Sequence, residues 1–250
     1  MSVQLFDCHC SIGLRTGAPV DEPSTVAEVL AEMDRLGIQR ALVAHTSGWE
    51  SVPWLGNRRV EEEAAGHARL TRAWTALPDT AGDVPPAQEW LTDMLGAGAR
   101  AAWLFPKRMN WSMEEWCAGS LLRALEDRRV PAFILLEETE LDQLHRVLER
   151  HSRLPLVLSC VSYRLNRMIY PLLERHANLH LDLAPRYDVH EGIEDITARV
   201  GAKRLLFGTN FPICDAGSAI AYLAYARISE EERALVGAGN LERLLAEVDA

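Results

Sequence analysis

Short apolar runs alternate with amphipathic segments along the whole chain. Each run is bounded by polar, Gly or Pro residues and is nearly continuous in apolar character, which is typical of a strand covered on both faces. Between the runs, apolar residues recur at helical spacing, as in segments 26–36 and 165–173. The pattern predicts eight strands, at residues 3–6, 41–44, 73–77, 101–105, 132–136, 154–158, 179–183 and 205–207.

Capping residues mark the ends of the predicted helices. Four hydroxyl side chains, each followed three positions later by a carboxylate, predict helix starts at Thr25, Ser112, Thr139 and Ser229. Glycines follow the last helical turns at Gly37, Gly98 and Gly201, as expected of C-caps.

Eight strands, each followed by a helix, indicate an α/β fold, namely a single (β/α)8 TIM barrel with residues 1–250 as one domain. A doubly wound open sheet is the competing interpretation. That fold usually binds its ligand beside a Gly-rich first turn, and the first turn here, residues 8–13, contains no such motif. The barrel is therefore the fold that we predict.

Charge and composition restrict the classes of partner that the protein can bind. The chain has 26 Lys and Arg residues against 36 Asp and Glu, a formal net charge of −10, which argues against nucleic acid and against anionic membrane surfaces. No apolar run approaches the roughly 20 residues that span a bilayer. The five cysteines form no CxxC pair and the first residues show no leader, so we expect free thiols in a cytoplasmic protein. A small molecule is the expected ligand.

Barrel enzymes react at the carboxyl ends of their strands, so polar side chains there are candidates for chemistry. The first strand ends in Asp7, His9 and Ser11, which strict alternation places on one face, with Cys8 and Cys10 on the other. The remaining predicted strand ends carry His45, Lys107, Arg108, Cys160, Asp182, Arg186, Thr209 and Asn210.

Two terminal motifs resemble a known family. Residues 7–13, Asp-Cys-His-Cys-Ser-Ile-Gly, resemble the Asp-x-His-x-His-x-Gly motif of the amidohydrolase superfamily, in the branch of decarboxylases and lactone hydrolases. Residues 204–212 resemble that branch's "rllfGTDyP" on the eighth strand, and residues 229–245 resemble its closing helices. The resemblance spans nearly the whole chain and implies a hydrolase or non-oxidative decarboxylase with a divalent metal, often zinc.

The resemblance also shows where the metal ligands should be. Residue by residue, the ligand positions used in the superfamily fall at His9, Ser11, Trp103, Leu135, Cys160 and Asn210. Catalytic zinc needs about three ligands from His, Cys and carboxylates, with an open position for water. One imidazole remains, and Asn210 lacks the charge to accept a proton from a metal-bound water. We therefore predict that the metal centre is absent and that the protein uses no cofactor.

His9, Asp182 and Cys160 are the predicted catalytic residues, for proton transfer or nucleophilic attack. A hydrogen-bonded rim histidine and a packed cysteine are the alternatives for the first and last. The predicted substrate-binding residues are Ser11, His45, Trp103, Lys107, Arg186 and Asn210. For the basic ones, a role as solvated rim charges is the alternative.

Residues outside the strand ends are less informative. Trp49 and Trp54 belong to a loop that is either a lid or a subunit contact. His145, His151 and His176 lie on predicted helices and are expected at the surface.

Two functions follow from these observations. The first is hydrolysis or non-oxidative decarboxylation of a small carboxylate or aromatic compound at a degenerate, metal-free site. The second is a catalytically silent barrel that binds a metabolite or serves as a subunit of an assembly. Because related barrels often pair, a homodimer is also expected.

Overall fold

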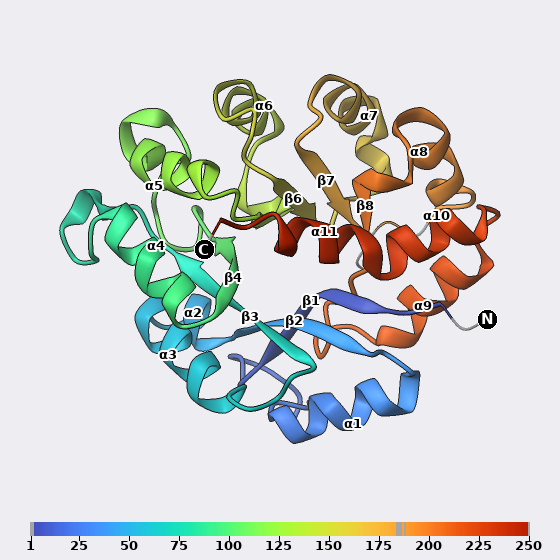
Figure 1. Cartoon of the computed structure of the whole chain (residues 1–250), viewed down its shortest axis with the longest axis horizontal. Helices are drawn as coiled ribbons and strands as arrows, with labels where there is room; N and C mark the ends of the chain where they lie inside the picture. The colour runs from blue at the N-terminus through green and yellow to red at the C-terminus, as the bar shows by residue number, and fades with distance from the viewer. Residues whose placement is uncertain (1–2, 184–186, 188, 250) are drawn as a thin grey trace.

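An eight-stranded parallel sheet forms the centre of the molecule, and helices surround it (Figure 1). The computed structural model describes residues 3–183, 187 and 189–249. The strands are neighbours in chain order, at β1 Phe6–Ile12, β2 Arg40–His45, β3 Leu70–Ala76, β4 Ala99–Leu104, β5 Ala132–Leu135, β6 Leu156–Ser159, β7 Leu179–Asp182 and β8 Leu205–Leu206. The predicted TIM barrel is confirmed.

Seven predicted strands overlap the observed ones along most of their length, whereas the first is displaced. The sequence predicts it at residues 3–6, but β1 is Phe6–Ile12. The sequence places Asp7, His9 and Ser11 at the end of this strand, and all three are buried inside β1.

The barrel closes where β1 meets the segment after β8. The backbone N–H of Cys8 donates to the Phe207 carbonyl at 2.9 Å, and that of Ser11 donates to the Phe211 carbonyl at 2.9 Å. These bonds supply the pairing that the two-residue β8 is too short to provide.

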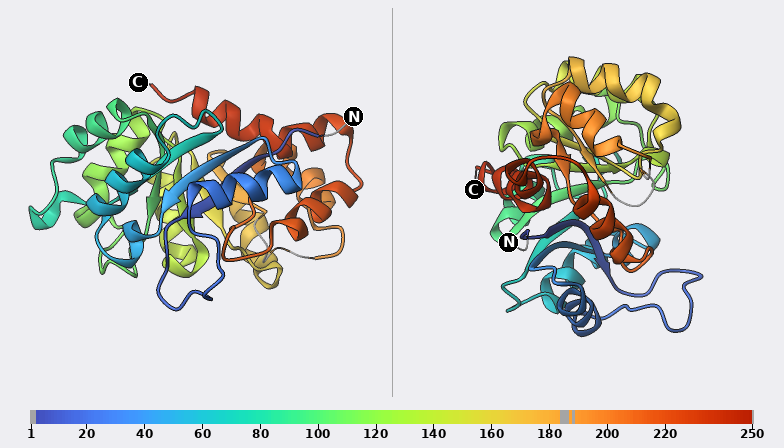
Figure 2. Two further views of the ribbon diagram at one scale, coloured as in Figure 1. Left: turned by 90° about the horizontal axis from the view of Figure 1, so that it is seen from below. Right: turned by 90° about the vertical axis from the view of Figure 1, so that its right-hand side faces the viewer.

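The helices form the outer ring and lie at α1 Val26–Leu36, α2 Ser47–Glu50, α3 Pro53–Glu63, α4 Ala87–Gly96, α5 Glu115–Asp127, α6 Leu141–Arg150, α7 Asn166–Arg175, α8 Gly192–Val200, α9 Ala216–Tyr225, α10 Glu230–Ala234 and α11 Asn240–Ala246. None of the described helices is long and apolar enough to cross a membrane. The closing helix α11 crosses one end of the barrel, and the loop between β1 and α1 projects from the opposite end (Figure 2, left).

Two of the four predicted helix starts are confirmed. Thr25 and Ser229 each form a capping box, with Glu28 and Glu232 respectively. The starts at Ser112 and Thr139 are wrong, because α5 and α6 are preceded by Glu114 and Glu140 as N-cap residues. The hydroxyl of Ser112 accepts from the Glu114 N–H at 3.2 Å, inside the preceding loop.

Gly37 and Gly201 are C-caps as predicted, whereas α4 ends at Gly96 with Ala97 as its cap and Gly98 follows one residue later.

A buried carboxylate joins β1 to the end of β8. Asp7 accepts hydrogen bonds from the backbone N–H groups of His9 (2.9 Å) and Thr209 (3.0 Å) and from the Thr209 hydroxyl (2.5 Å). Burial raises the pKa of Asp7 to about 7, although these hydrogen bonds act in the opposite direction. The carboxyl group therefore holds its proton to a higher pH when folded than when unfolded.

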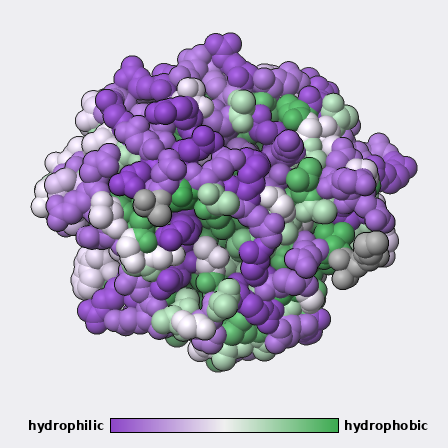
Figure 3. Space-filling view, in the orientation of Figure 1, coloured by the Kyte–Doolittle hydropathy of each residue, from purple (hydrophilic) through white to green (hydrophobic). Residues whose placement is uncertain are grey.

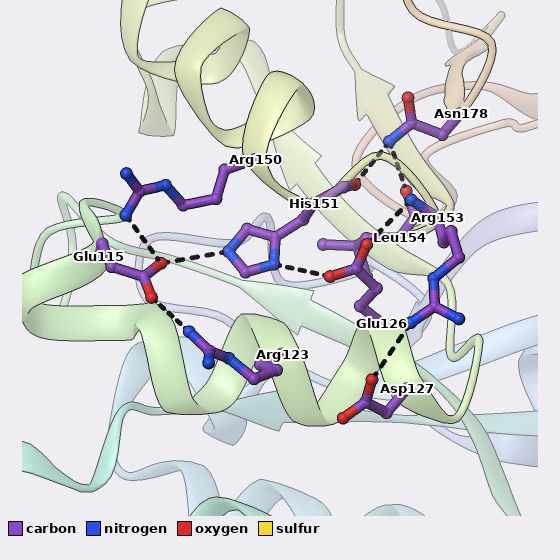
Figure 4. Close-up of polar contacts among 9 residues, drawn as sticks. All are labelled: Glu115, Arg123, Glu126, Asp127, Arg150, His151, Arg153, Leu154 and Asn178. Atoms are coloured by element: carbon purple, nitrogen blue, oxygen red, sulfur yellow. Dashed lines mark hydrogen bonds and ion pairs between the residues drawn. The ribbon is translucent and has the colours of Figure 1, made fainter.

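A second polar network lies near the amino ends of the strands, between α5 and the turn before β6 (Figure 4). His151 is 3% exposed, and its Nδ1 is 2.9 Å from Glu126 Oε2. The other oxygen of Glu126 accepts from the Arg153 N–H at 2.9 Å, and Asn178 donates to the carbonyls of His151 and Leu154. The expectation that His151 and His176 are surface residues is wrong, because both are buried between helices and strand ends.

Replacing His151 by Ala is expected to destabilise the protein by about 1–3 kcal/mol, because it leaves the buried Glu126 Oε2 without its hydrogen-bond partner. Chemical denaturation at neutral pH measures this loss. The control is Arg58→Ala, which removes an exposed ion pair with Glu62 and is expected to cost less than about 0.5 kcal/mol. Equal stabilities of the two variants would contradict this role of His151.

The raised pKa of Asp7 predicts a pH-dependent difference in stability between the wild type and Asp7→Asn. Between about pH 4 and pH 7, the native wild type binds more protons than the unfolded chain, so its stability falls as the pH rises. Asp7→Asn lacks this titration. The free energy of unfolding of the wild type minus that of the variant is expected to decrease by at least about 1 kcal/mol over this interval. A difference that stays constant would show that Asp7 titrates normally.

Candidate active site

A cavity of about 220 Å³ opens at the carboxyl ends of the strands, the end away from α11. Side chains from β1, β2, β4 and β5 and from the segments that follow β1, β2, β4, β5, β6 and β8 line it. This is where the sequence predicts chemistry in a barrel.

A bulge in β1 decides which of its residues reach the cavity. Phe6 and Cys8 belong to the cluster inside the barrel, whereas Cys10 belongs to the outer cluster between strands and helices. The register against β2 shifts between Asp7 and Cys10. Such a bulge reverses the faces of the residues beyond it, so the prediction that Cys8 and Cys10 share a face is wrong.

His9, within this bulge, and Ser11, beyond it, line the cavity together with Cys10. His9 Nδ1 lies 2.8 Å from Asp182 Oδ2 at the end of β7. The Asp182 side chain is fully buried and the His9 side chain is 11% exposed, so the pair opens to the cavity through the imidazole. The ring of His9 packs against Trp103, with centroids 4.7 Å apart.

Close packing fixes the position of Asp182. A Cβ added to Gly208 would lie 2.0 Å from Asp182 Oδ1, so residue 208 has no room for a side chain. The neighbouring Cys8 thiol has a pKa well above its usual value because of burial and the charges of Asp182 and Asp7. Cys8 therefore remains a thiol and does not compete as a nucleophile.

An aromatic wall faces the histidine. Trp103 and Phe105 are stacked at a centroid distance of 5.9 Å, and Trp49 lies 5.3 Å from Phe105. Trp103 was predicted from the resemblance alone, and Trp49 from the aromatic loop after the second strand. Phe105 was predicted only as part of a strand.

Two arginines contribute charge to the cavity. Arg15 pairs with Glu22 at 2.6 Å, while its buried Nε has no hydrogen-bond partner among the described residues. Arg108 pairs with Glu137 at 2.9 Å and Glu138 at 3.1 Å. Sequence reasoning missed Arg15, because it lies in a loop and its spacing from β1 signals nothing.

Cys160 and Asn210 also line the cavity, and both have left-handed backbone conformations, with φ of 57° and 56°. The amide of Asn210 donates to the Cys214 sulfur at 3.6 Å. The cavity therefore brings together His9, Ser11, Trp103, Cys160 and Asn210 from the predicted set, with Asp182 beneath His9.

The other predicted substrate-binding residues lie elsewhere. His45 is buried, its Nδ1 accepts from the Ser47 N–H at 3.0 Å, and burial lowers its pKa. Lys107 pairs with Glu140 at 2.6 Å. Neither lines the cavity. Arg186 lies outside the described residues.

The donors at this site do not fit the metal that the resemblance implies. His9 commits one ring nitrogen to Asp182, and the aligned positions otherwise offer a hydroxyl, a thiol, an amide and the apolar Leu135. Zinc sites combine about three His, Cys or carboxylate ligands. Within residues 3–183, 187 and 189–249, no three His, Cys, Asp or Glu side chains are grouped to hold a metal ion.

Solved structures of similar fold include enzymes that act on ring carboxylates. The 5-carboxyvanillate decarboxylase of Sphingomonas paucimobilis is 15% identical, with a TM-score of 0.77 over 98% of this chain and 99% of that one. A proposed 2-pyrone-4,6-dicarboxylic acid hydrolase of Pseudomonas putida is 16% identical, with a TM-score of 0.72 over 99% of both chains. The dihydroxybenzoic acid decarboxylase of Polaromonas sp. JS666, with bound manganese and 2-nitroresorcinol, is 15% identical, with a TM-score of 0.74 over 98% and 97%.

These identities are low, and the likeness establishes the fold alone. The chain matches none of the curated proteins with which it was compared. A model of the amidohydrolase family matches residues 6–246, which is nearly the whole chain. The chain therefore belongs to the amidohydrolase family.

Proposed function

We propose that this amidohydrolase-family barrel hydrolyses or non-oxidatively decarboxylates a small aromatic or pyrone carboxylate without a metal. The observation that carries the proposal is the His9–Asp182 pair, which opens through His9 onto a cavity walled by aromatic rings. The structural neighbours that act on such carboxylates support the substrate class.

His9 is the group that moves protons. Asp182 lies 2.8 Å from Nδ1 and fixes the orientation of the ring, while Nε2 makes no hydrogen bond to the described residues. In a decarboxylation, His9 delivers a proton to the ring carbon that loses its carboxylate. In a hydrolysis, it removes a proton from the attacking water. Cys160 remains a predicted catalytic residue, as a nucleophile on the cavity wall.

The walls of the cavity suit a flat anion. Trp103 and Phe105 offer faces against which a ring packs, and Arg15 retains a buried Nε donor. Ser11 and Asn210 can hydrogen-bond polar substituents of the ring. The volume of about 220 Å³ lies below that of pockets for drug-sized ligands, which favours a single-ring substrate.

The second candidate is a barrel that binds such a carboxylate without transforming it. Leu135 and Asn210 favour it, since they stand where the resemblance places a metal ligand and a charged proton acceptor. Under this hypothesis, the cavity binds the same ligands but His9 turns nothing over. A homodimer, a cytoplasmic location and substrate contacts from His45, Lys107 and Arg186 stay predictions under both candidates.

Turnover of 2,6-dihydroxybenzoate, 5-carboxyvanillate and 2-pyrone-4,6-dicarboxylate, followed by absorbance and CO₂ release, tests the proposal. His9→Ala is expected to reduce kcat by about 100-fold or more with little change in KM, because it removes the proton-transfer group. Asp182→Asn is expected to reduce kcat less, since His9 remains. The matched control is His190→Ala, a histidine whose side chain is 90% exposed.

Equal turnover by wild type and His9→Ala would remove His9 from the mechanism. Binding of these carboxylates by calorimetry, with no turnover of any of them by the wild type, would favour the silent barrel. That result would overturn the enzymatic proposal, while the proposal that the cavity binds aromatic or pyrone carboxylates would remain supported.

A further inference from the structure

A second hollow, of about 550 Å³, lies on the face of the barrel opposite the active-site cavity. Its lining comes from the amino ends of β6, β7 and β8 and from α11: Pro155 precedes β6, Asn178 precedes β7, and Arg204 precedes β8. Figures 1 and 3 look onto this face, where α11 crosses the barrel and the surface is largely hydrophilic.

Basic side chains dominate this hollow. Its charged lining residues are Arg129, Arg153, Lys203, Arg204, Arg243 and Glu247. Two further carboxylates contact Arg153: Asp127 pairs with its guanidinium at 3.4 Å, and Glu126 accepts from its backbone N–H at 2.9 Å (Figure 4). Five cations against these three carboxylates leave a local charge of about +2, whereas the chain as a whole carries −10.

The cations are held together without enough acidic partners. Glu247 is shared between Arg129, at 2.6 Å, and Arg243, at 3.5 Å. Arg204 donates to the carbonyls of Leu179 and His176 instead of a carboxylate. Lys203 forms no ion pair within the described part of the chain.

Burial and the crowding of positive charges lower the pKa values of two residues at this hollow. Burial and the neighbouring Arg243 lower the pKa of Arg204 to about 10. Burial, with the charges of Arg204 and Arg243, lowers the pKa of His180 to about 3. Neighbouring like charges repel, and a bound anion offsets the repulsion.

We propose that this hollow binds a multiply charged oxyanion, the phosphate or diphosphate group of a small molecule. Arginine forks match phosphate oxygens, and Lys203 adds a mobile ammonium at the exposed edge. A long polyanion such as nucleic acid is disfavoured, because the rest of the acidic surface repels it. The site is independent of the activity proposed for the opposite face.

The two lysines of the chain make a direct test possible. Lys203 lines the hollow, and Lys107 lies beyond β4 at the opposite end of the barrel, paired with Glu140. An amine-reactive ester is applied to the full chain at constant ionic strength, with pyrophosphate in metal-free buffer, and each lysine is quantified by mass spectrometry. Pyrophosphate is expected to slow the labelling of Lys203 by about fivefold or more, and Lys107 serves as the internal control.

Two further arms make the result decisive. Acetate at the same ionic strength is expected to leave Lys203 labelling unchanged. In calorimetric titrations, Arg243→Ala is expected to weaken pyrophosphate binding by about tenfold or more, whereas Arg58→Ala leaves it unchanged. Arg243 is chosen because its own contacts are long, 3.5 Å to Glu247 and 3.4 Å to the Lys203 carbonyl, so the fold does not depend on it.

Equal protection of both lysines, protection by acetate as strong as by pyrophosphate, or an unchanged affinity in Arg243→Ala would each overturn the proposal. None of these outcomes bears on His9 or on turnover at the other face. The oxyanion site and the proposed carboxylate chemistry are therefore tested independently of each other.

Discussion

The structure depends on two buried carboxylates that tie the first strand to the last two. Asp7 joins β1 to Thr209 after β8, and Asp182 at the end of β7 holds the imidazole of His9 on β1. They act beside the backbone bonds that Cys8 and Ser11 donate to the segment after the two-residue β8. The side-chain bonds at this seam therefore also hold His9, the histidine that lines the cavity among the described residues, and closure and candidate chemistry share one set of residues.

Both carboxylates require their surroundings to compensate for burial. Asp7 receives three hydrogen bonds and nevertheless keeps a raised pKa, because the donors offset only part of the desolvation. Asp182 needs a glycine at position 208, where any side chain would collide with its oxygen. The Gly208-Thr209 pair is thus used twice, once to admit Asp182 and once to bind Asp7.

The fold was largely predictable from the sequence, because eight apolar runs with helices between them allow few other arrangements. The position of β1 was not, since a strand whose polar residues are buried at a barrel seam resembles a loop. No residue type in this segment of the sequence predicts the bulge that places His9 and Ser11 at the cavity. His9 and Asp182 were predictable as strand ends, but their contact, over 173 positions, depends on closure. Arg15 and the basic hollow were not predictable, because each gathers residues from distant loops.

We propose that this amidohydrolase-family site works through His9 and Asp182 and without a bound metal. The most direct test is elemental analysis of the purified protein, before and after incubation with zinc or manganese, together with carboxylate binding in the presence of a chelator. For a metal-free site we expect at most on the order of a tenth of an equivalent of metal per chain, and binding that the chelator leaves unchanged. About one equivalent of tightly held metal, with binding lost on its removal, would contradict it.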